Sequence, residues 1–156
     1  STKSFKVAKA IFGDVVGSEY LGPERQPGRR YLRANRRFLV RHEDLVHLSF
    51  PSEAFNLVVT QDVFEHIPQY RDAFKEILRV LAPAGSLVFT VPFFAEETQT
   101  RIRAVVNGDG AVQHILPPEI HGNPVDKGGS LCFQNFGWDI LDDLTECGFV
   151  SAEAHL

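Results

Sequence analysis

Three polar residues that could do chemistry lie close together in the middle of the chain. Asp62, Glu65 and His66 directly follow the apolar run Phe55–Thr60. An imidazole is the commonest general base at neutral pH, and a neighbouring carboxylate can support it. We therefore take His66 as the candidate catalytic base and Glu65 as its support. The alternative is that His66 only orders the start of the following helix.

The elements around these residues follow from apolar periodicity. Apolar side chains at positions 70, 73, 74, 77, 78 and 81 form one face of a helix of three turns, which Pro83–Gly85 breaks. Three apolar runs indicate buried strands of a parallel sheet: Phe38–Val40, Phe55–Thr60 and Ser86–Val91. The middle of the chain therefore alternates strand and helix.

The flanking regions complete a predicted α/β fold with a mainly parallel sheet. The further predicted elements, in chain order, are a helix over 4–12 that stops at Gly13, a strand within 15–20, a loop over 22–37, a short helix near 98–106, a helix around 138–144 closed by Gly148, and a last strand over 149–156. Residues 94–135 otherwise lose periodicity amid Gly and Pro, which indicates a lid or substrate loop.

Composition narrows the class of protein. A chain of 156 residues with 44% hydrophobic and 23% charged residues suits one globular domain over 1–156, with 94–135 as an insertion. No apolar run approaches the ~20 residues of a membrane span, so we expect a soluble, cytoplasmic protein without a membrane partner. The net charge of −4 argues against a nucleic-acid partner, although arginines cluster over 25–37.

Four spaced segments together resemble the class I S-adenosylmethionine-dependent methyltransferases, in particular the type 11 branch with its DVxEH signature. They are Val16–Leu21, Asp44–Phe50, Phe55–His66 and Leu81–Phe89. The resemblance implies a Rossmann-like α/β fold with S-adenosylmethionine as the cofactor. It also implies transfer of a methyl group to a small-molecule or glycan-like acceptor.

The resemblance also assigns the cofactor-binding residues. Glu19 would end the second strand and accept hydrogen bonds from both ribose hydroxyls, which suits a carboxylate with two acceptor oxygens. Asp44 would accept from the adenine amino group while the Leu45 amide serves the ring nitrogen. Gln61 and Asp62 would follow the fourth strand. Glu19, Asp44 and Gln61 are then expected on one edge of the sheet, at the carboxyl ends of the strands.

The chain departs from the family pattern at several places. Asn56 stands where the family usually has Asp, and Ala84 replaces the first Gly of an LxPGG turn. A left-handed backbone at residue 84 would be strained, so we expect a different turn or a left-handed Gly85. The glycine-rich loop that wraps the methionine part of the cofactor would lie before Ser1.

The fold is therefore expected to lack its first and seventh strands. Three arrangements would fill the gap left by the first strand: the second strand pairs with the fourth, residues 4–12 become a strand, or a homo-oligomer donates one.

Other interpretations of the same residues remain open. Asp62, Glu65 and His66 have a spacing that suits a divalent metal ion, with His121 as a fourth ligand. Because the signature is common in enzymes with no known metal there, no metal is predicted. The alternative function is a catalytically inactive remnant that acts as an oligomeric or interaction module. A dinucleotide-dependent oxidoreductase also suits Glu19, but the DVxEH segment and the turn at Pro83–Gly85 argue against it.

Overall fold

The computed structural model describes residues 3–32, 39–122 and 128–155. The chain forms two compact units, Ser1–Ser49 and Phe50–Leu156, and each is described by itself. Part of the predicted arginine cluster, together with Phe38, lies outside the described residues. Among the described residues, no helix is both long and apolar enough to cross a lipid bilayer.

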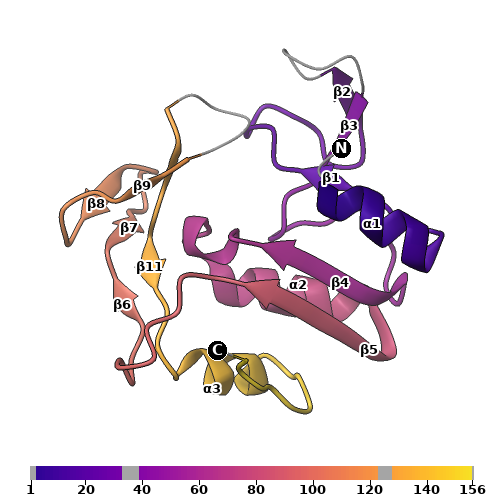
Figure 1. The fold of residues 1–156 in the computed structure, drawn as a ribbon. Helices are drawn as coiled ribbons and strands as arrows, with labels where there is room; N and C mark the ends of the chain where they lie inside the picture. The colour runs from indigo at the N-terminus through magenta and orange to yellow at the C-terminus, as the bar shows by residue number, and fades with distance from the viewer. Residues whose placement is uncertain (1–2, 33–38, 123–127, 156) are drawn as a thin grey trace. The chain divides into compact units, whose positions relative to one another are not determined.

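The first unit holds one helix and a three-stranded sheet (Figure 1). Helix α1 (Lys3–Phe12) ends at Gly13, whose φ of 75° suits a residue without Cβ. Strand β3 (Leu39–His42) pairs in parallel with β1 (Ser18–Glu19) and antiparallel with β2 (Arg30–Leu32). The helix over 4–12 is confirmed, which rules out its use as a strand. The predicted loop over 22–37 was wrong at β2.

The second unit is built on two parallel strands and a helix (Figure 1). Strand β4 (Phe55–Gln61) pairs with β5 (Leu81–Thr90), and α2 (Tyr70–Val80) connects them after a 3-10 turn, η1 (Phe64–His66). The apolar stripe of α2 contributes Phe74 and Ile77, which are fully buried together with Phe64. Burying each such side chain contributes about 1.5–3 kcal/mol. The central strands and helix therefore form as predicted.

The irregular stretch within β5 at Pro83–Gly85 corrects one expectation. Ala84 itself adopts the left-handed conformation, with φ 63°, and Gly85 has no positive φ. Gly85 is needed for space instead, because a Cβ there would lie 2.8 Å from the Ala82 carbonyl oxygen and 3.1 Å from that of Phe55. The left-handed backbone that we expected the chain to avoid at residue 84 is therefore present at Ala84.

The described residues of 94–135 contain short strands, which the loss of periodicity did not predict. They are β6 (Arg101–Ile102), β7 (Ala104–Val106), β8 (Val112–His114), β9 (Ile120–His121), β10 (Ser130–Leu131) and β11 (Gln134–Asn135). The pairs β7–β8, β9–β10 and β6–β11 are all antiparallel. The predicted helix near 98–106 was therefore wrong. Among the named strands of the described residues, parallel pairing is confined to β1–β3 and β4–β5, so the sheet is less parallel than predicted.

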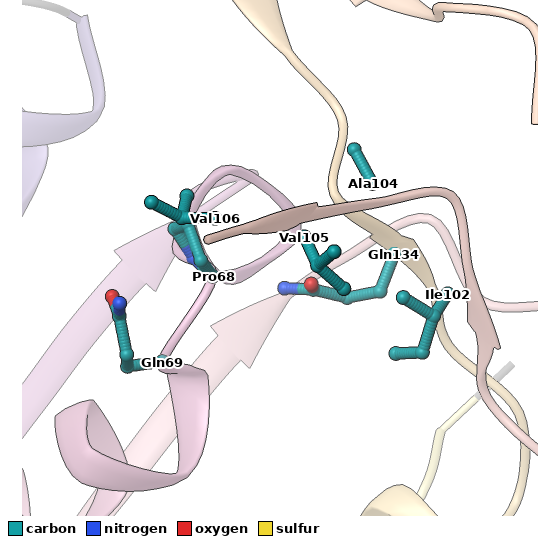
Figure 2. A pocket seen from close by; sticks show the side chains of 7 residues that line it. All are labelled: Pro68, Gln69, Ile102, Ala104, Val105, Val106 and Gln134. Atoms are coloured by element: carbon teal, nitrogen blue, oxygen red, sulfur yellow. The ribbon is translucent and has the colours of Figure 1, made fainter. Parts of the chain in front are cut away.

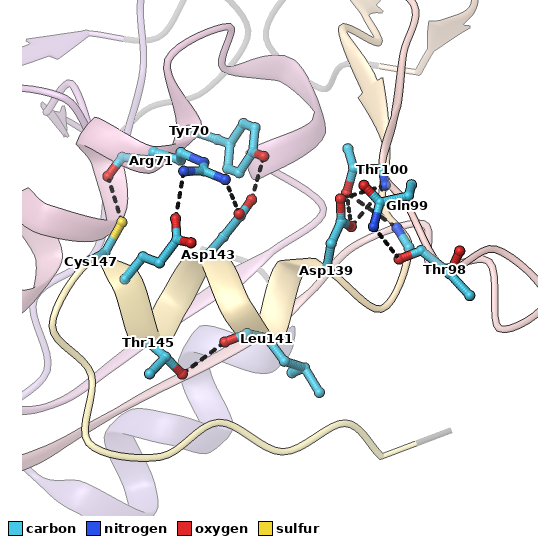
Figure 3. Close-up of polar contacts among 12 residues, drawn as sticks. Tyr70, Arg71, Thr98, Gln99, Thr100, Asp139, Leu141, Asp143, Thr145 and Cys147 are labelled. Atoms are coloured by element: carbon cyan, nitrogen blue, oxygen red, sulfur yellow. Dashed lines mark hydrogen bonds and ion pairs between the residues drawn. The ribbon is translucent and has the colours of Figure 1, made fainter.

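Side-chain hydrogen bonds hold helix α3 (Ile140–Glu146) at its start and at its middle (Figure 3). At its start, the Asp139 carboxylate accepts hydrogen bonds from the Thr100 amide at 2.8 Å and hydroxyl at 2.6 Å. Further along, Asp143 accepts from the Tyr70 hydroxyl and the Arg71 guanidinium of α2. The chain leaves the helix through Gly148, as predicted, at φ 108°.

Two further predictions concern the last strand and the gap left by the first strand. The described residues 149–155 form no strand, so the predicted last strand was wrong there. Pairing of the second strand with the fourth stays a prediction, because β1 and β4 belong to different units. The absence of the first and seventh strands of the family, and a strand donated by another copy, stay predictions.

Candidate functional site

Glu19 and Asp44 lie at the same edge of the first unit's sheet. Because β1 and β3 run in parallel, with Glu19 opposite His42, both strands end at this edge. The Glu43 amide donates a hydrogen bond to the Glu19 carbonyl at 3.2 Å, so the chain beyond β3 stays beside β1. Asp44 is the next residue. The structure therefore places the two residues that the sequence assigns to adenosine at one edge of the sheet.

The backbone at Asp44 forms a tight turn. The carboxylate Oδ1 of Asp44 accepts from the Val46 amide at 3.1 Å, and its carbonyl accepts from the His47 amide at 2.9 Å. The Leu45 amide between them donates to no group of the described residues. A carboxylate beside an available amide can serve both an amino group and a ring nitrogen. The residues present thus fit the adenosine part of S-adenosylmethionine.

A buried ion pair supports this turn, and sequence reasoning missed it. Glu43 accepts hydrogen bonds from the Arg41 guanidinium at 2.6 Å and from the Ser49 hydroxyl and amide at 2.6 and 2.9 Å. Burial opposes ionisation of Glu43, but these bonds and the Arg41 charge outweigh it and lower its pKa. The alternation of Arg41 and Glu43 on β3 was the available signal, since residues two apart share a face.

In the second unit, Gln61 and Asp62 lie at the carboxyl end of β4, and both are exposed. Asp62 has φ 51° and is tied to the end of β5: its amide donates to the Thr90 carbonyl at 3.0 Å, and its Oδ1 accepts from the Thr90 hydroxyl at 3.0 Å. Their place beside Glu19 stays a prediction, because they belong to the other unit.

Glu65, His66 and His121 converge on one point in the second unit. The Glu65 side chain is fully buried, and its Oε1 lies 3.6 Å from Nε2 of His66 and 3.6 Å from Nδ1 of His121. Neither carboxylate oxygen of Glu65 has a hydrogen-bond partner among the described residues. Burial raises the pKa of this carboxyl. Three side chains thus face one another without bonding.

The outer nitrogens of the two imidazoles fix their tautomers. Nδ1 of His66 lies 2.8 Å from the Leu131 carbonyl oxygen, which can only accept, so Nδ1 carries the proton. Nε2 of His121 lies 2.8 Å from Oε1 of Glu119 and donates to it in the same way. In the neutral rings, the lone pairs of both inner nitrogens therefore point at Glu65. Sequence reasoning assigned no role to Glu119.

Residues around β11 hold η1 in place. The backbone amide of Phe133 donates to the Glu65 carbonyl at 2.7 Å. The buried side-chain amide of Gln134 donates to the carbonyls of Phe64 at 2.6 Å and Ile67 at 3.0 Å. Three backbone carbonyls in and just after the turn, those of Phe64, Glu65 and Ile67, thereby find partners. The DVxEH segment is therefore positioned by a segment almost seventy residues later.

A cleft of about 290 Å³ opens next to this turn (Figure 2). The wall is mainly aliphatic, with side-chain amides as its polar groups. It is lined by Pro68, Gln69, Ile102, Ala104, Val105, Val106 and Gln134. Three of these residues come from β7, inside the segment that the sequence assigned to substrate or lid.

The comparisons with known proteins give a family. A model described as a methyltransferase domain matches residues 3–89. No curated protein matches the chain.

Two solved structures resemble it weakly. The [4+2]-cyclase SpnF has 20% identity and a TM-score of 0.43, covering 70% of this chain and 32% of its own. An S-adenosylmethionine-dependent methyltransferase from Mesorhizobium loti has 17% identity and a TM-score of 0.44, covering 75% of this chain and 56% of its own. The chain thus spans about a third of the first protein and just over half of the second.

Proposed function

Since the chain belongs to the methyltransferase domain family matched over residues 3–89, we propose that it transfers a methyl group from S-adenosylmethionine to a small-molecule acceptor. Membership of the family implies S-adenosylmethionine as the cofactor. The observation that carries the proposal is the common edge of Glu19 and Asp44, where two parallel strands end. Ligands of open α/β sheets bind beyond such ends.

The residues of the first unit would bind and orient the cofactor. The carboxylate of Glu19 would accept from the two ribose hydroxyls, Asp44 would accept from the adenine amino group, and the Leu45 amide would donate to the ring. The cofactor, when bound, would supply an electrophilic methyl group. Attack on that methyl group depends mainly on positioning, and the hydrogen-bonded Asp44 turn would contribute by orienting the cofactor.

The acceptor side lies in the second unit under this proposal. The side chains that line the cleft beside η1 are mainly aliphatic, with amides at Gln69 and Gln134, which supports a small-molecule acceptor. Two groups that precede Pro68 and Gln69 of the cleft in the sequence could take a proton from a hydroxyl acceptor: His66 and Glu65. The family match does not favour the alternative of an inactive remnant.

The cofactor assignment is tested by calorimetric titration with S-adenosylhomocysteine. Glu19→Gln and Asp44→Asn each remove one charged acceptor, and we expect each to weaken binding about tenfold or more. Asp109→Asn is the control, because Asp109 lies in an exposed turn and bonds only to the Ala111 amide. Full affinity in both site variants would sink the assignment, as would absence of heat with the folded wild-type chain at high micromolar ligand.

A further inference from the structure

We propose that Glu65, His66 and His121 form a binding site for one divalent first-row transition-metal ion. The ligand atoms would be Oε1 of Glu65, Nε2 of His66 and Nδ1 of His121, which all lie within 4.8 Å of one another. The site goes beyond methyl transfer, and metal binding can be tested without an acceptor or a cofactor.

The carboxylate of Glu65 is buried without a hydrogen-bond partner in the described part of the chain. Its side chain has no exposed surface, and both oxygens lack a hydrogen bond within the described residues. A buried carboxylate without partners is costly, and proteins normally pair it or use it to coordinate a metal. The two imidazole nitrogens lie 3.6 Å from Oε1, too far for hydrogen bonds. An ion between the three atoms would satisfy all of them.

The distances between the three side chains are close to those of a metal site. Ligand bonds of about 2.0–2.1 Å in a tetrahedral site place neighbouring ligand atoms about 3.3–3.4 Å apart. The two separations of 3.6 Å from Oε1 of Glu65 need only a few tenths of an ångström of closure. The ring planes of His66 and His121 are nearly perpendicular, at 82°, so the two imidazoles do not stack face to face beside Glu65.

The ring nitrogens of both histidines that face away from Glu65 are also hydrogen-bonded. Histidines that bind metals usually donate their other N–H to a carbonyl or carboxylate, which fixes the tautomer and the ring orientation. His66 donates to the Leu131 carbonyl and His121 to Glu119. Glu119 is held in turn by Arg103, whose Nη1 lies 3.2 Å from its Oε2. Both rings are thus oriented with an unprotonated nitrogen facing inward.

The ligand types select the ion. Two imidazoles and one carboxylate suit ions such as Zn²⁺, Co²⁺ and Mn²⁺, whereas Mg²⁺ prefers oxygen ligands alone. The nearby Cys132 is not counted as a ligand, because its thiol is buried and donates to the Gln134 carbonyl. Asp62, which the spacing had suggested, is tied to Thr90 and is not among the converging residues.

An ion at this site would change the role of His66. Its Nε2 lone pair would bind the metal, so His66 would be a ligand rather than a general base. Three protein ligands leave a coordination position open to water or to an acceptor oxygen, as in catalytic zinc sites. Methyl transfer to an acceptor hydroxyl would then depend on the ion.

The test is a Co²⁺ titration of the tag-free full chain, followed by visible absorption and calorimetry. We expect one equivalent of Co²⁺ to bind, with d–d bands in the visible region, and Zn²⁺ to displace it. Mg²⁺ should not compete. Absence of binding by folded wild-type chain at millimolar Co²⁺ would overturn the proposal, and equal competition by Mg²⁺ would overturn the ligand assignment.

Variants locate the site. Glu65→Gln, His66→Gln and His121→Gln should each weaken Co²⁺ binding at least about 100-fold, and Glu119→Gln about 10–100-fold as a positioning residue. His114→Gln is the matched control, since His114 is exposed on β8. Melting curves in EDTA check that each variant folds. His121 is only half-buried on β9, so His121→Gln keeps the test decisive if a substitution at Glu65 impairs folding.

Imidazole nitrogen NMR provides a second readout with Zn²⁺. Before the ion is added, the proton should reside on Nδ1 of His66 and on Nε2 of His121. Zn²⁺ should then shift Nε2 of His66 and Nδ1 of His121, and leave His114 unchanged. Shifts confined to the opposite nitrogens, or to His114, would contradict the proposed site.

Discussion

At the scale of single residues, the backbone of Ala84 is strained. An L-residue with φ 63° pays about 1–2 kcal/mol relative to glycine, and Ala84 is exposed, so its methyl group contributes little packing. We predict that Ala84→Gly raises the free energy of unfolding by about 0.5–1 kcal/mol in urea denaturation. Ala111→Gly, exposed without a positive φ, should instead lower it; equal losses in both variants would contradict this account.

Gly137 is constrained by space rather than by its dihedral angle. A Cβ at this position would lie 2.7 Å from the Gln99 carbonyl carbon and 2.8 Å from the Glu97 carbonyl oxygen. Gly137→Ala should therefore cost about 1–3 kcal/mol of stability. Gly108→Ala is the control and should change the unfolding midpoint little, because a Cβ at Gly108 would have nothing within 4 Å. A neutral Gly137→Ala would show that the segment relaxes freely.

Glu43 gives the first unit a dependence on pH. Its folded pKa is below the ordinary value of about 4.3, so its ionised form stabilises the fold above that value. This contribution is lost as the pH falls through the folded pKa. We predict that Glu43→Gln lowers stability by about 1–3 kcal/mol at pH 7 and that the difference shrinks below pH ~4. Glu153→Gln, in the exposed tail, should show no such trend in the same denaturation series.

At the scale of elements, Tyr70 connects α2 to α3 (Figure 3). Its hydroxyl donates to the buried Asp143, and burial, reinforced by this bond, raises the pKa of Tyr70, so the proton stays in place at ordinary pH. Tyr70→Phe should cost about 1.5–3 kcal/mol by chemical denaturation, because a charged acceptor loses its donor. Tyr31→Phe is the control, since its hydroxyl bonds an exposed Gln26 amide. Equal effects in the two variants would refute the role of Tyr70.

The elements that sequence predicted best are those with long periodic patterns. Six apolar positions define α2, and continuous apolar runs define β4 and the second half of β5. Strands β6, β9, β10 and β11 have two residues each, too few for any period to appear. They are stabilised by pairing with distant segments, which local sequence does not contain.

The residues of the candidate site also differ in how far the sequence predicts them. Glu19 and Asp44 could be predicted because each follows a strand directly, and parallel strands end together. The sequence suggests Asp62, His66 and His121 beside Glu65 as metal ligands, and the structure brings His66 and His121 together with Glu65. It ties Asp62 to Thr90 instead, a contact that nothing in the local sequence indicates.

At the scale of the whole molecule, the central claim is that this chain binds S-adenosylmethionine at the ends of its parallel strands. The most direct measurement is a titration of the ¹⁵N-labelled chain with S-adenosylhomocysteine, followed by amide NMR. We predict saturable shifts concentrated at Glu19 and at Asp44–Val46, with the amide of Leu45 among the largest. Absence of shifts at millimolar ligand, or shifts that leave both segments untouched, would contradict it.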